Sequence, residues 1–228
     1  MPPTQTVFLV DDEPGMLKAL TRLLKAEGFT VRGFPSARTF LESYRAEELS
    51  CLVLDVAMPE LNGLDLQQRL THAGILLPIV FLTGHGDIPM SVQAIKAGAV
   101  DFLTKPVNDA DLLRAVRAAL QRAAEQRERA SETANLRERL ASLTPREREV
   151  MDHVVAGQLN KQIAGDLGTG EHTIKVHRAR VMQKMGVESL ADLVRVAAKL
   201  GGEVISNQSS VISHQIQGTP HRSLITDH

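Results

Sequence analysis

The sequence predicts an α/β domain with a five-stranded parallel sheet, joined by a long helix to a second domain that contains only helices. Two observations support this division. Short apolar runs alternate with helical patterns in the first half, whereas the second half shows helical patterns alone. The six Phe and one Tyr all lie between Phe8 and Phe102, so the second domain must build its core from aliphatic side chains.

Each predicted strand is a short run of apolar residues. The runs cover residues 7–10, 51–54, 79–82 and 100–103, and a weaker one lies near Thr30. Because the runs do not alternate with polar residues, we expect strands that are buried on both faces, which is typical of a parallel sheet covered by helices. Ligands of such folds bind at the carboxyl ends of the strands.

The helices between these strands are amphipathic. In the first of them, apolar residues recur at spacings of three and four between Met16 and Leu24. Pro14 suits the first turn of this helix, and Gly28 can end it. The alternation of strand and helix therefore indicates a sheet with helices on both sides.

A longer helical pattern begins at about Asp109. Apolar and small residues continue at helical spacing into a stretch rich in Ala, Glu, Arg and Gln that reaches about Leu140. An unbroken helix of about 30 residues extends ~45 Å. A flexible charged linker is the alternative, because Thr133 and Asn135 both weaken a helix.

Four short helices are predicted in the second domain. The tetrapeptide at 144–147 has the capping-box pattern, with Pro145 at the first helical position. Glycines at 157, 168 and 186 end the first, second and third of these helices. The tail shows no periodicity. The expected parts are an α/β domain at 1–120, a helical linker at 121–142, a helical domain at 143–200 and an irregular tail at 201–228.

Composition indicates a cytoplasmic protein. Cys51 is the one cysteine, and its apolar neighbours predict a buried, reduced thiol. The N-terminus lacks the pattern of a signal peptide, and no apolar stretch reaches the ~20 residues of a membrane span. We therefore expect no membrane partner.

Charged and polar side chains follow four of the predicted strands. Asp11 and Asp12 follow the first strand, Asp55 the third, Thr83 the fourth and Lys105 the fifth. Three carboxylates at one edge of a sheet repel one another unless a hard divalent cation such as Mg²⁺ lies among them. A hydroxyl and an ammonium beside them are suited to hold a phosphoryl group. Each residue alone is an ordinary turn former, so the prediction depends on the combination.

This combination resembles the receiver domain of two-component response regulators, which has a flavodoxin-like fold. The resemblance implies that Asp55 accepts a phosphoryl group from a sensor histidine kinase, and that Thr83 and Lys105 contact that group. The residues implied to bind Mg²⁺ are Asp11, Asp12, Asp55 and, through its backbone carbonyl, Ala57.

Three other features near this site follow from the same resemblance. Phe102 matches the aromatic residue that moves inward when the threonine approaches the phosphate, but an ordinary core Phe explains it equally well. The Lys105-Pro106 bond is expected to be cis. His85 lies in a loop similar to that of the FixJ-like subfamily, and a single loop histidine is more often a solvent or backbone contact than an acceptor.

Turnover of a separate substrate is the weaker hypothesis. A phosphatase of the haloacid dehalogenase type needs a second Asp two residues after the nucleophile, where this chain has Ala57. The chain also lacks the glycine-rich loops that bind nucleotide phosphates. We therefore expect a switch that accepts the phosphoryl group itself and not an enzyme acting on other molecules.

The helix predicted at 171–185 has two different faces. Ile174, Val181 and Met185 lie together on one face, and the opposite face is short or polar enough to enter the major groove of DNA. A solvated amphipathic helix is the alternative. The candidate DNA-binding residues are Lys161, Thr173, Lys175, Val176, Arg178, Ala179, Arg180 and Lys184. Among them Lys175 is placed toward base edges, and Lys161 and Arg180 toward phosphates.

The segments at 143–147, 160–164 and 173–178 closely resemble the LuxR-type four-helix output domain. Together with the receiver, the resemblance covers nearly everything from Thr6 to Leu200 and indicates a FixJ-type response regulator. It implies a transcription factor whose partners are double-stranded promoter DNA, RNA polymerase and, on phosphorylation, a second copy of the chain. An RNA-binding module or a phosphorylation-independent regulator is the alternative, although residues 103–228 contain no aromatic side chain for base stacking.

Overall fold

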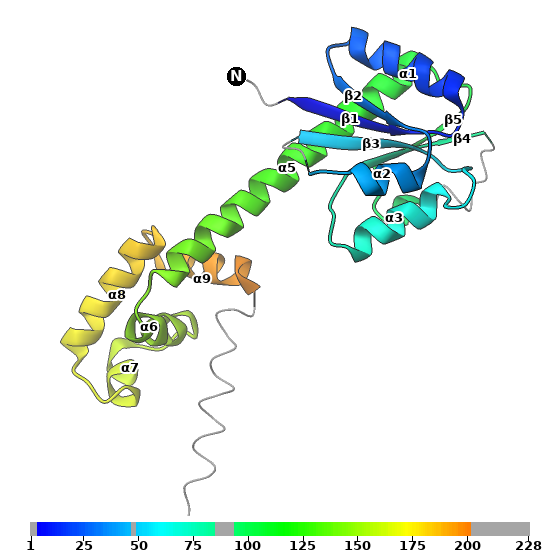
Figure 1. The fold of residues 1–228 in the computed structure, drawn as a ribbon. Helices are drawn as coiled ribbons and strands as arrows, with labels where there is room; N and C mark the ends of the chain where they lie inside the picture. The colour runs from blue at the N-terminus through cyan, green and yellow to red at the C-terminus, as the bar shows by residue number, and fades with distance from the viewer. Residues whose placement is uncertain (1–3, 47–48, 85–93, 202–228) are drawn as a thin grey trace, which may run out of the picture. The chain divides into compact units, whose positions relative to one another are not determined.

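A computed structural model describes residues 4–46, 49–84 and 94–201 of the chain (Figure 1). The chain divides into two compact units, residues 1–129 and 130–228, which are described separately here. His85 and nearly all of the tail expected to be irregular lie outside the described residues.

The first unit contains a five-stranded parallel sheet in the order β2-β1-β3-β4-β5. Its strands are β1 (Gln5–Val10), β2 (Thr30–Phe34), β3 (Leu49–Asp55), β4 (Ile79–Thr83) and β5 (Asp101–Thr104). The strand order reverses between β1 and β3, which is where doubly wound sheets bind their ligands. The predicted fold class is confirmed, including the weak strand near Thr30.

Helices cover both faces of this sheet (Figure 1). The helices described in this unit are α1 (Pro14–Ala26), α2 (Ala37–Ser43), α3 (Gly63–His72) and the first part of α5 (Asp109–Ala141). α1 and α5 pack on the face that carries Val7 and Leu9, and α2 and α3 pack on the face that carries Phe8 and Val10. Successive side chains of β1 thus enter separate cores, which explains why the strand is apolar throughout.

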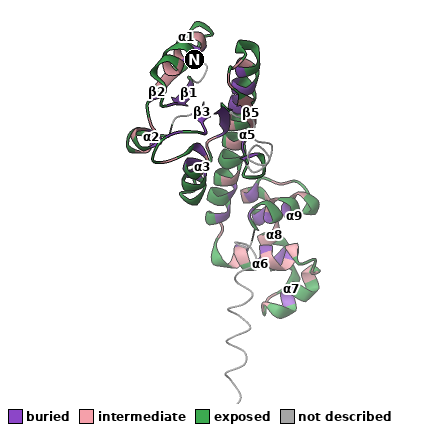
Figure 2. Cartoon of the chain, turned by 90° about the vertical axis from the view of Figure 1, so that its right-hand side faces the viewer, coloured by how far each residue is buried: buried purple, intermediate pink, exposed green. Residues whose placement is uncertain are grey.

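Every residue of β3 and β4 is buried, as is every residue of β1 except Gln5, whereas the outer faces of the helices are exposed (Figure 2). Cys51 lies in this buried sheet, and burial raises the pKa of its thiol to about 12. The thiol is therefore protonated and unreactive at neutral pH. No helix in the described part of the chain is both long enough and apolar enough to cross a membrane.

The long helix is confirmed as one continuous element. α5 has 33 residues and passes through Thr133 and Asn135 without a break. Its first turns bury Leu112 and Val116 in the core of the first unit, and its last turns bury Leu136 and Leu140 in the core of the second unit. The C-terminal part of the segment expected as a linker is therefore packed.

The second unit has the four predicted helices. They are α6 (Pro145–Val155), α7 (Asn160–Asp166), α8 (Glu171–Met185) and α9 (Leu190–Lys199). The capping box at Thr144 and Glu147 is present, and Gly186 ends α8 with a left-handed φ of 66°. The core of this unit is aliphatic apart from its methionines, as the distribution of aromatic residues predicted.

Candidate functional site

The three predicted carboxylates meet at the carboxyl ends of β1 and β3. Val10 pairs with Leu54 in the sheet, so Asp11 and Asp55 leave neighbouring strands side by side. Each of the three side chains offers one oxygen, and these oxygens lie within 4.8 Å of one another. Asp11 and Asp55 are buried, at 0% and 4% exposure, whereas Asp12 is exposed. These three residues are called the acidic pocket. Its carboxylates repel one another, and little solvent reaches Asp11 and Asp55 to screen their charges.

Lys105 bridges the two buried carboxylates. Its Nζ donates to Asp11 Oδ2 at 2.8 Å and to Asp55 Oδ2 at 2.9 Å. Burial by itself disfavours the charged form of Lys105, but these hydrogen bonds and the two negative charges outweigh that cost and raise the pKa of Lys105 above its ordinary value. The ammonium therefore stays charged across the physiological range.

The end of β4 positions this lysine. The backbone N–H of Lys105 donates to the carbonyl oxygen of Thr83 at 2.6 Å, and the Lys105-Pro106 bond is cis, as expected. Thr83 is 3% exposed and pairs with Thr104 in the sheet. Phe102 is half-buried in β5, with its ring centroid 6.1 Å from that of Phe81. All of the predicted residues thus lie at or near the same end of the sheet.

A glycine that the sequence interpretation did not single out shapes the acceptor strand. A Cβ at Gly63 would lie 2.4 Å from the carbonyl oxygen of Asp55, which is far closer than any van der Waals contact. The N–H of Gly63 donates to the carbonyl of Val56 at 3.0 Å, so the start of α3 lies directly against the end of β3. The sequence feature that could have indicated this helix start is Asn62, an N-cap residue followed by glycine.

The donor set suits a hard divalent cation. Lys105 supplies one positive charge to the three carboxylates, which leaves an excess of two negative charges. Asp55 Oδ1 accepts a hydrogen bond from the N–H of Ala57 at 3.2 Å, which orients the carboxylate, and Ala57 itself is exposed. Carboxylate, carbonyl and water oxygens are the ligands that Mg²⁺ prefers, so the residues present fit this ion.

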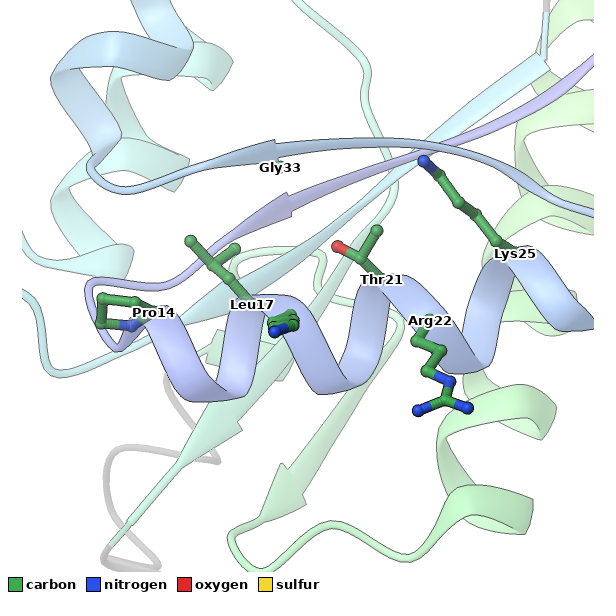
Figure 3. Close-up of a pocket in the computed structure, with 7 residues that line it drawn as sticks. Pro14, Leu17, Thr21, Arg22, Lys25 and Gly33 are labelled. Carbon is green, nitrogen blue, oxygen red and sulfur yellow. The ribbon is translucent and has the colours of Figure 1, made fainter.

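A hollow of about 630 Å³ lies along α1 (Figure 3). It shares no residue with the acidic pocket, although Pro14 follows Asp12 closely in the sequence. Pro14, Leu17 and Gly33 contribute apolar surface. Lys18, Arg22 and Lys25 line the hollow with cationic groups. Within the described residues, none of these three cations forms an ion pair. The hollow is open to solvent.

The second unit carries a helix-turn-helix arrangement formed by α7 and α8. The helical-wheel prediction for α8 agrees with the burial of its residues: Ile174, Val181 and Met185 are buried in the core. The residues on the opposite face are exposed. These exposed candidates are Thr173, Lys175, Val176, Ala179 and Arg180, and Lys161 of α7 is also exposed.

The structure changes the assignment of two candidates. Lys184 does not project from the reading face, because its Nζ binds the buried carboxylate of Glu147 at 2.6 Å and the carbonyl of Ser142 at 3.0 Å. The ammonium of Lys184 is therefore engaged within the domain and not directed toward DNA. Arg178 is half-buried and donates to Asn160 Oδ1 at 3.2 Å, so it joins α8 to α7.

Comparison with known proteins decides the family. The chain matches the response regulator receiver domain over residues 7–117 and the luxR family of bacterial regulatory proteins over residues 141–197. The chain belongs to the response regulators with a LuxR-type DNA-binding domain.

Named relatives of this response regulator share both domains. It is 48% identical to the response regulator protein TodT of Pseudomonas putida over 194 residues, which cover 85% of this chain and 86% of TodT. It is 49% identical to nodulation protein W of Bradyrhizobium diazoefficiens, with 86% of each chain covered.

Two solved structures show the same architecture. The response regulator StyR has a TM-score of 0.74 at 47% identity, covering 86% of this chain and 99% of StyR. Full-length FixJ from B. japonicum has a TM-score of 0.53 at 40% identity, covering 86% and 97% of the two chains. The expected FixJ-type organisation is confirmed.

Glu147 is the residue of the DNA-binding domain that sequence interpretation assigned only as a cap. Its carboxylate is 2% exposed and accepts from Lys184 Nζ and from the N–H of Thr144 at 2.9 Å. The hydrogen bond from Lys184 and then that from Thr144 lower its pKa from 4.5 to about 2. One carboxylate thus caps α6 and fixes the last turn of α8.

This depressed pKa predicts a pH-dependent stability of the response regulator. The contribution of Glu147 is complete above its unfolded pKa of 4.5 and is lost as the pH falls toward about 2. Glu147→Gln is expected to lower the free energy of unfolding by about 1–3 kcal/mol at pH 7, and by progressively less below pH 4.5. Urea unfolding followed by circular dichroism at several pH values measures this difference.

The control for this experiment is Glu149→Gln. Glu149 lies on the same helix but forms an exposed pair with Arg146, so its loss should change stability by less than about 1 kcal/mol. A difference between the wild type and Glu147→Gln that stays constant from pH 7 to pH 2 would contradict the assigned role of the carboxylate.

Proposed function

We propose that this response regulator is switched by phosphorylation of Asp55 and that the switch controls DNA binding by α8. In this proposal residues 1–120 are the phosphoacceptor domain, 121–142 the linker and 143–200 the DNA-binding domain. The observation that carries the proposal is the bridge from Lys105 to the buried carboxylates of Asp11 and Asp55. A buried structural ion pair needs one carboxylate per ammonium, whereas this pocket has an excess of carboxylates suited to a cation and a phosphoryl group.

The pocket residues have distinct roles in phosphoryl transfer. A carboxylate oxygen of Asp55 attacks phosphorus, so the new bond is P–O and the bond to the donor histidine nitrogen breaks. Lys105 offers its ammonium to the phosphoryl oxygens, and the hydroxyl of Thr83 approaches them from β4. Asp11, Asp12, Asp55 and the carbonyl of Ala57 would hold Mg²⁺, which would neutralise charge on the phosphoryl oxygens.

Phosphorylation is coupled to the rest of the molecule because some contacts form only in the phosphorylated state. Thr83 and Lys105 can contact the phosphoryl group only in the phosphorylated state, so phosphorylation favours the arrangement in which they do. Phe102 pairs with Phe81 in the sheet and packs against its ring, and it lies two residues before Thr104, the sheet partner of Thr83. We propose that Phe102 moves when Thr83 approaches the phosphoryl group. We propose that the unphosphorylated chain is mainly a monomer and that the altered surface favours a homodimer.

We further propose that the histidine kinase docks over the hollow along α1. The donor histidine must reach Asp55, so the kinase has to cover surface close to the acidic pocket, and α1 begins two residues after Asp12. The apolar lining residues and the cations Lys18 and Arg22 suit a partner surface with apolar and acidic side chains.

For the output we propose sequence-specific binding of α8 in the major groove of promoter DNA. Its exposed face carries Lys175, Val176 and Arg180, a mixture of base-reading and phosphate-binding side chains. RNA polymerase is the expected functional partner on the promoter, and the cytoplasm is the expected compartment. RNA binding is the alternative, and it would appear as a preference of the chain for single-stranded RNA over duplex DNA.

The acceptor assignment is tested by substituting the carboxylates separately. Asp55→Ala is expected to abolish labelling by acetyl phosphate and Mg²⁺, because the nucleophile is lost. Asp12→Ala should keep the acceptor but weaken Mg²⁺ binding, and Asp65→Ala, outside the pocket, should change neither. Labelling is measured as retarded mobility of the phosphoprotein on a phosphate-affinity gel. Full labelling of Asp55→Ala would show that another residue is the acceptor.

Docking of the kinase is tested by removing the cations of the hollow. Lys18→Ala/Arg22→Ala is expected to slow phosphotransfer from a phosphorylated histidine kinase by about tenfold, because charges at the edge of an interface raise the association rate. Labelling by acetyl phosphate, which needs no protein contact, should be unchanged. The control is Arg38→Ala/Arg69→Ala on the opposite face of the sheet. Equal slowing by both double variants would remove the hollow from the kinase interface.

The DNA contacts are separated by titrations at several salt concentrations. Lys175→Ala is expected to cost about 1–3 kcal/mol on a duplex selected by the wild-type chain and much less on random duplex. Lys161→Ala or Arg180→Ala should weaken both duplexes equally and reduce the salt slope by about 0.9. An unchanged ratio of selected to random affinity in Lys175→Ala would mean that another face of α8 reads the bases.

A further inference from the structure

The last turns of α5 contact the C-terminal end of α8 at several points within the second unit. Arg139 Nη1 donates to the carbonyl oxygen of Met185 at 3.0 Å. In the opposite direction Lys184 Nζ donates to the carbonyl of Ser142, the residue that follows α5, at 3.0 Å. Leu136 and Leu140 are buried in the same core as Met185. The end of the DNA-reading helix is therefore held by a helix that begins in the other unit.

Arg139 meets a need that α8 does not satisfy with its own side chains. The last carbonyl groups of a helix lack partners within the helix, and positive charge near them is favourable. Lys184 is the basic residue of the last turn of α8, but its ammonium is bound to Glu147 and Ser142. The guanidinium of Arg139 thus supplies the cation at this helix end.

Gly186 leaves the space for this contact. It has the left-handed φ of 66°, and a Cβ at this position would lie 2.1 Å from Arg139 Nη1. A larger residue would therefore strain the backbone and displace the guanidinium from Met185. Gly186 and Arg139 therefore act together at the end of α8.

The middle and the C-terminal end of α8 are held by different elements. Near its middle, Arg178 donates to Asn160 of α7. At the C-terminal end the contacts come from Arg139 of α5 and from Glu147 of α6, which binds Lys184. A further ion pair at 2.6 Å joins Glu132 of α5 to Lys199 of α9. The direction of the reading face is thus set by α7 at its middle and by α5 and α6 at its C-terminal end.

We propose that Arg139 is a positioning residue for DNA recognition, and that the last turns of α5 are a functional part of the DNA-reading domain. By holding the carbonyl of Met185, Arg139 fixes the tilt of α8 and so the approach of its exposed face to the bases. The inference rests on the proposed binding of DNA by α8. A turn or displacement of α5 then acts on the reading helix directly.

The test uses the full-length chain and two duplexes, one selected from a random pool by the wild type and one with that sequence scrambled. Arg139→Ala is expected to lower affinity for the selected duplex by about fivefold and for the scrambled duplex by less than about twofold. Arg139→Lys, which keeps one charged donor, should restore most of the loss. The control is Arg122→Ala, which removes the same charge from α5 at an exposed arginine.

Three outcomes would overturn the proposal or its basis. Equal loss on both duplexes, with a lower free energy of unfolding, would mean that Arg139 is only structural. Equal effects of Arg139→Ala and Arg122→Ala would mean that net charge is responsible. No preference of the wild type for the selected duplex would contradict the proposed function itself. Gly186→Ala is expected to lower the ratio of selected to scrambled affinity as Arg139→Ala does. Combining the two substitutions should add little, because both break the same contact.

Discussion

The excess of negative charge at the carboxyl edge of the sheet is the constraint on which the first domain depends. Asp11 and Asp55 are almost completely buried, and buried carboxylates are costly unless they are paired. Lys105 pairs with both, and its backbone is held by Thr83 at the end of the neighbouring strand. The parallel sheet brings residues from the ends of four strands to one point, which makes this arrangement possible.

Much of the fold and of this pocket could be predicted because the signals are local. A uniformly apolar run predicts a buried strand, and a polar residue directly after it must lie at the edge of the sheet. Asp55, Thr83 and Lys105 were all placed in this way. The role of Gly63 could not be predicted. A Cβ at this position would lie 2.4 Å from the carbonyl oxygen of Asp55, and the spacing of residues along the chain does not reveal this distance.

The second domain shows the limit of a helical wheel. The wheel correctly separated the buried and exposed residues of α8, since helical geometry fixes the direction of each side chain. It does not identify partners on other helices, and so it left Lys184 among the DNA contacts although Glu147 binds it. The same limit concealed Arg139, whose partner Met185 lies 46 positions along the chain.

The two lysine–carboxylate sites of this chain differ in a way that matches their roles. Lys184 and Glu147 balance each other in charge, and the remaining partners of Glu147 come from the cap of α6, so the pair needs nothing further and acts as a fixed joint. Lys105 pairs with two of the three carboxylates in the acidic pocket, and the negative charge that is left favours the binding of a divalent cation. A balanced pair holds one structure, whereas an unbalanced cluster responds to its ligands. This difference supports the proposed roles, in which the first domain acts as a switch and the second keeps its reading helix in place.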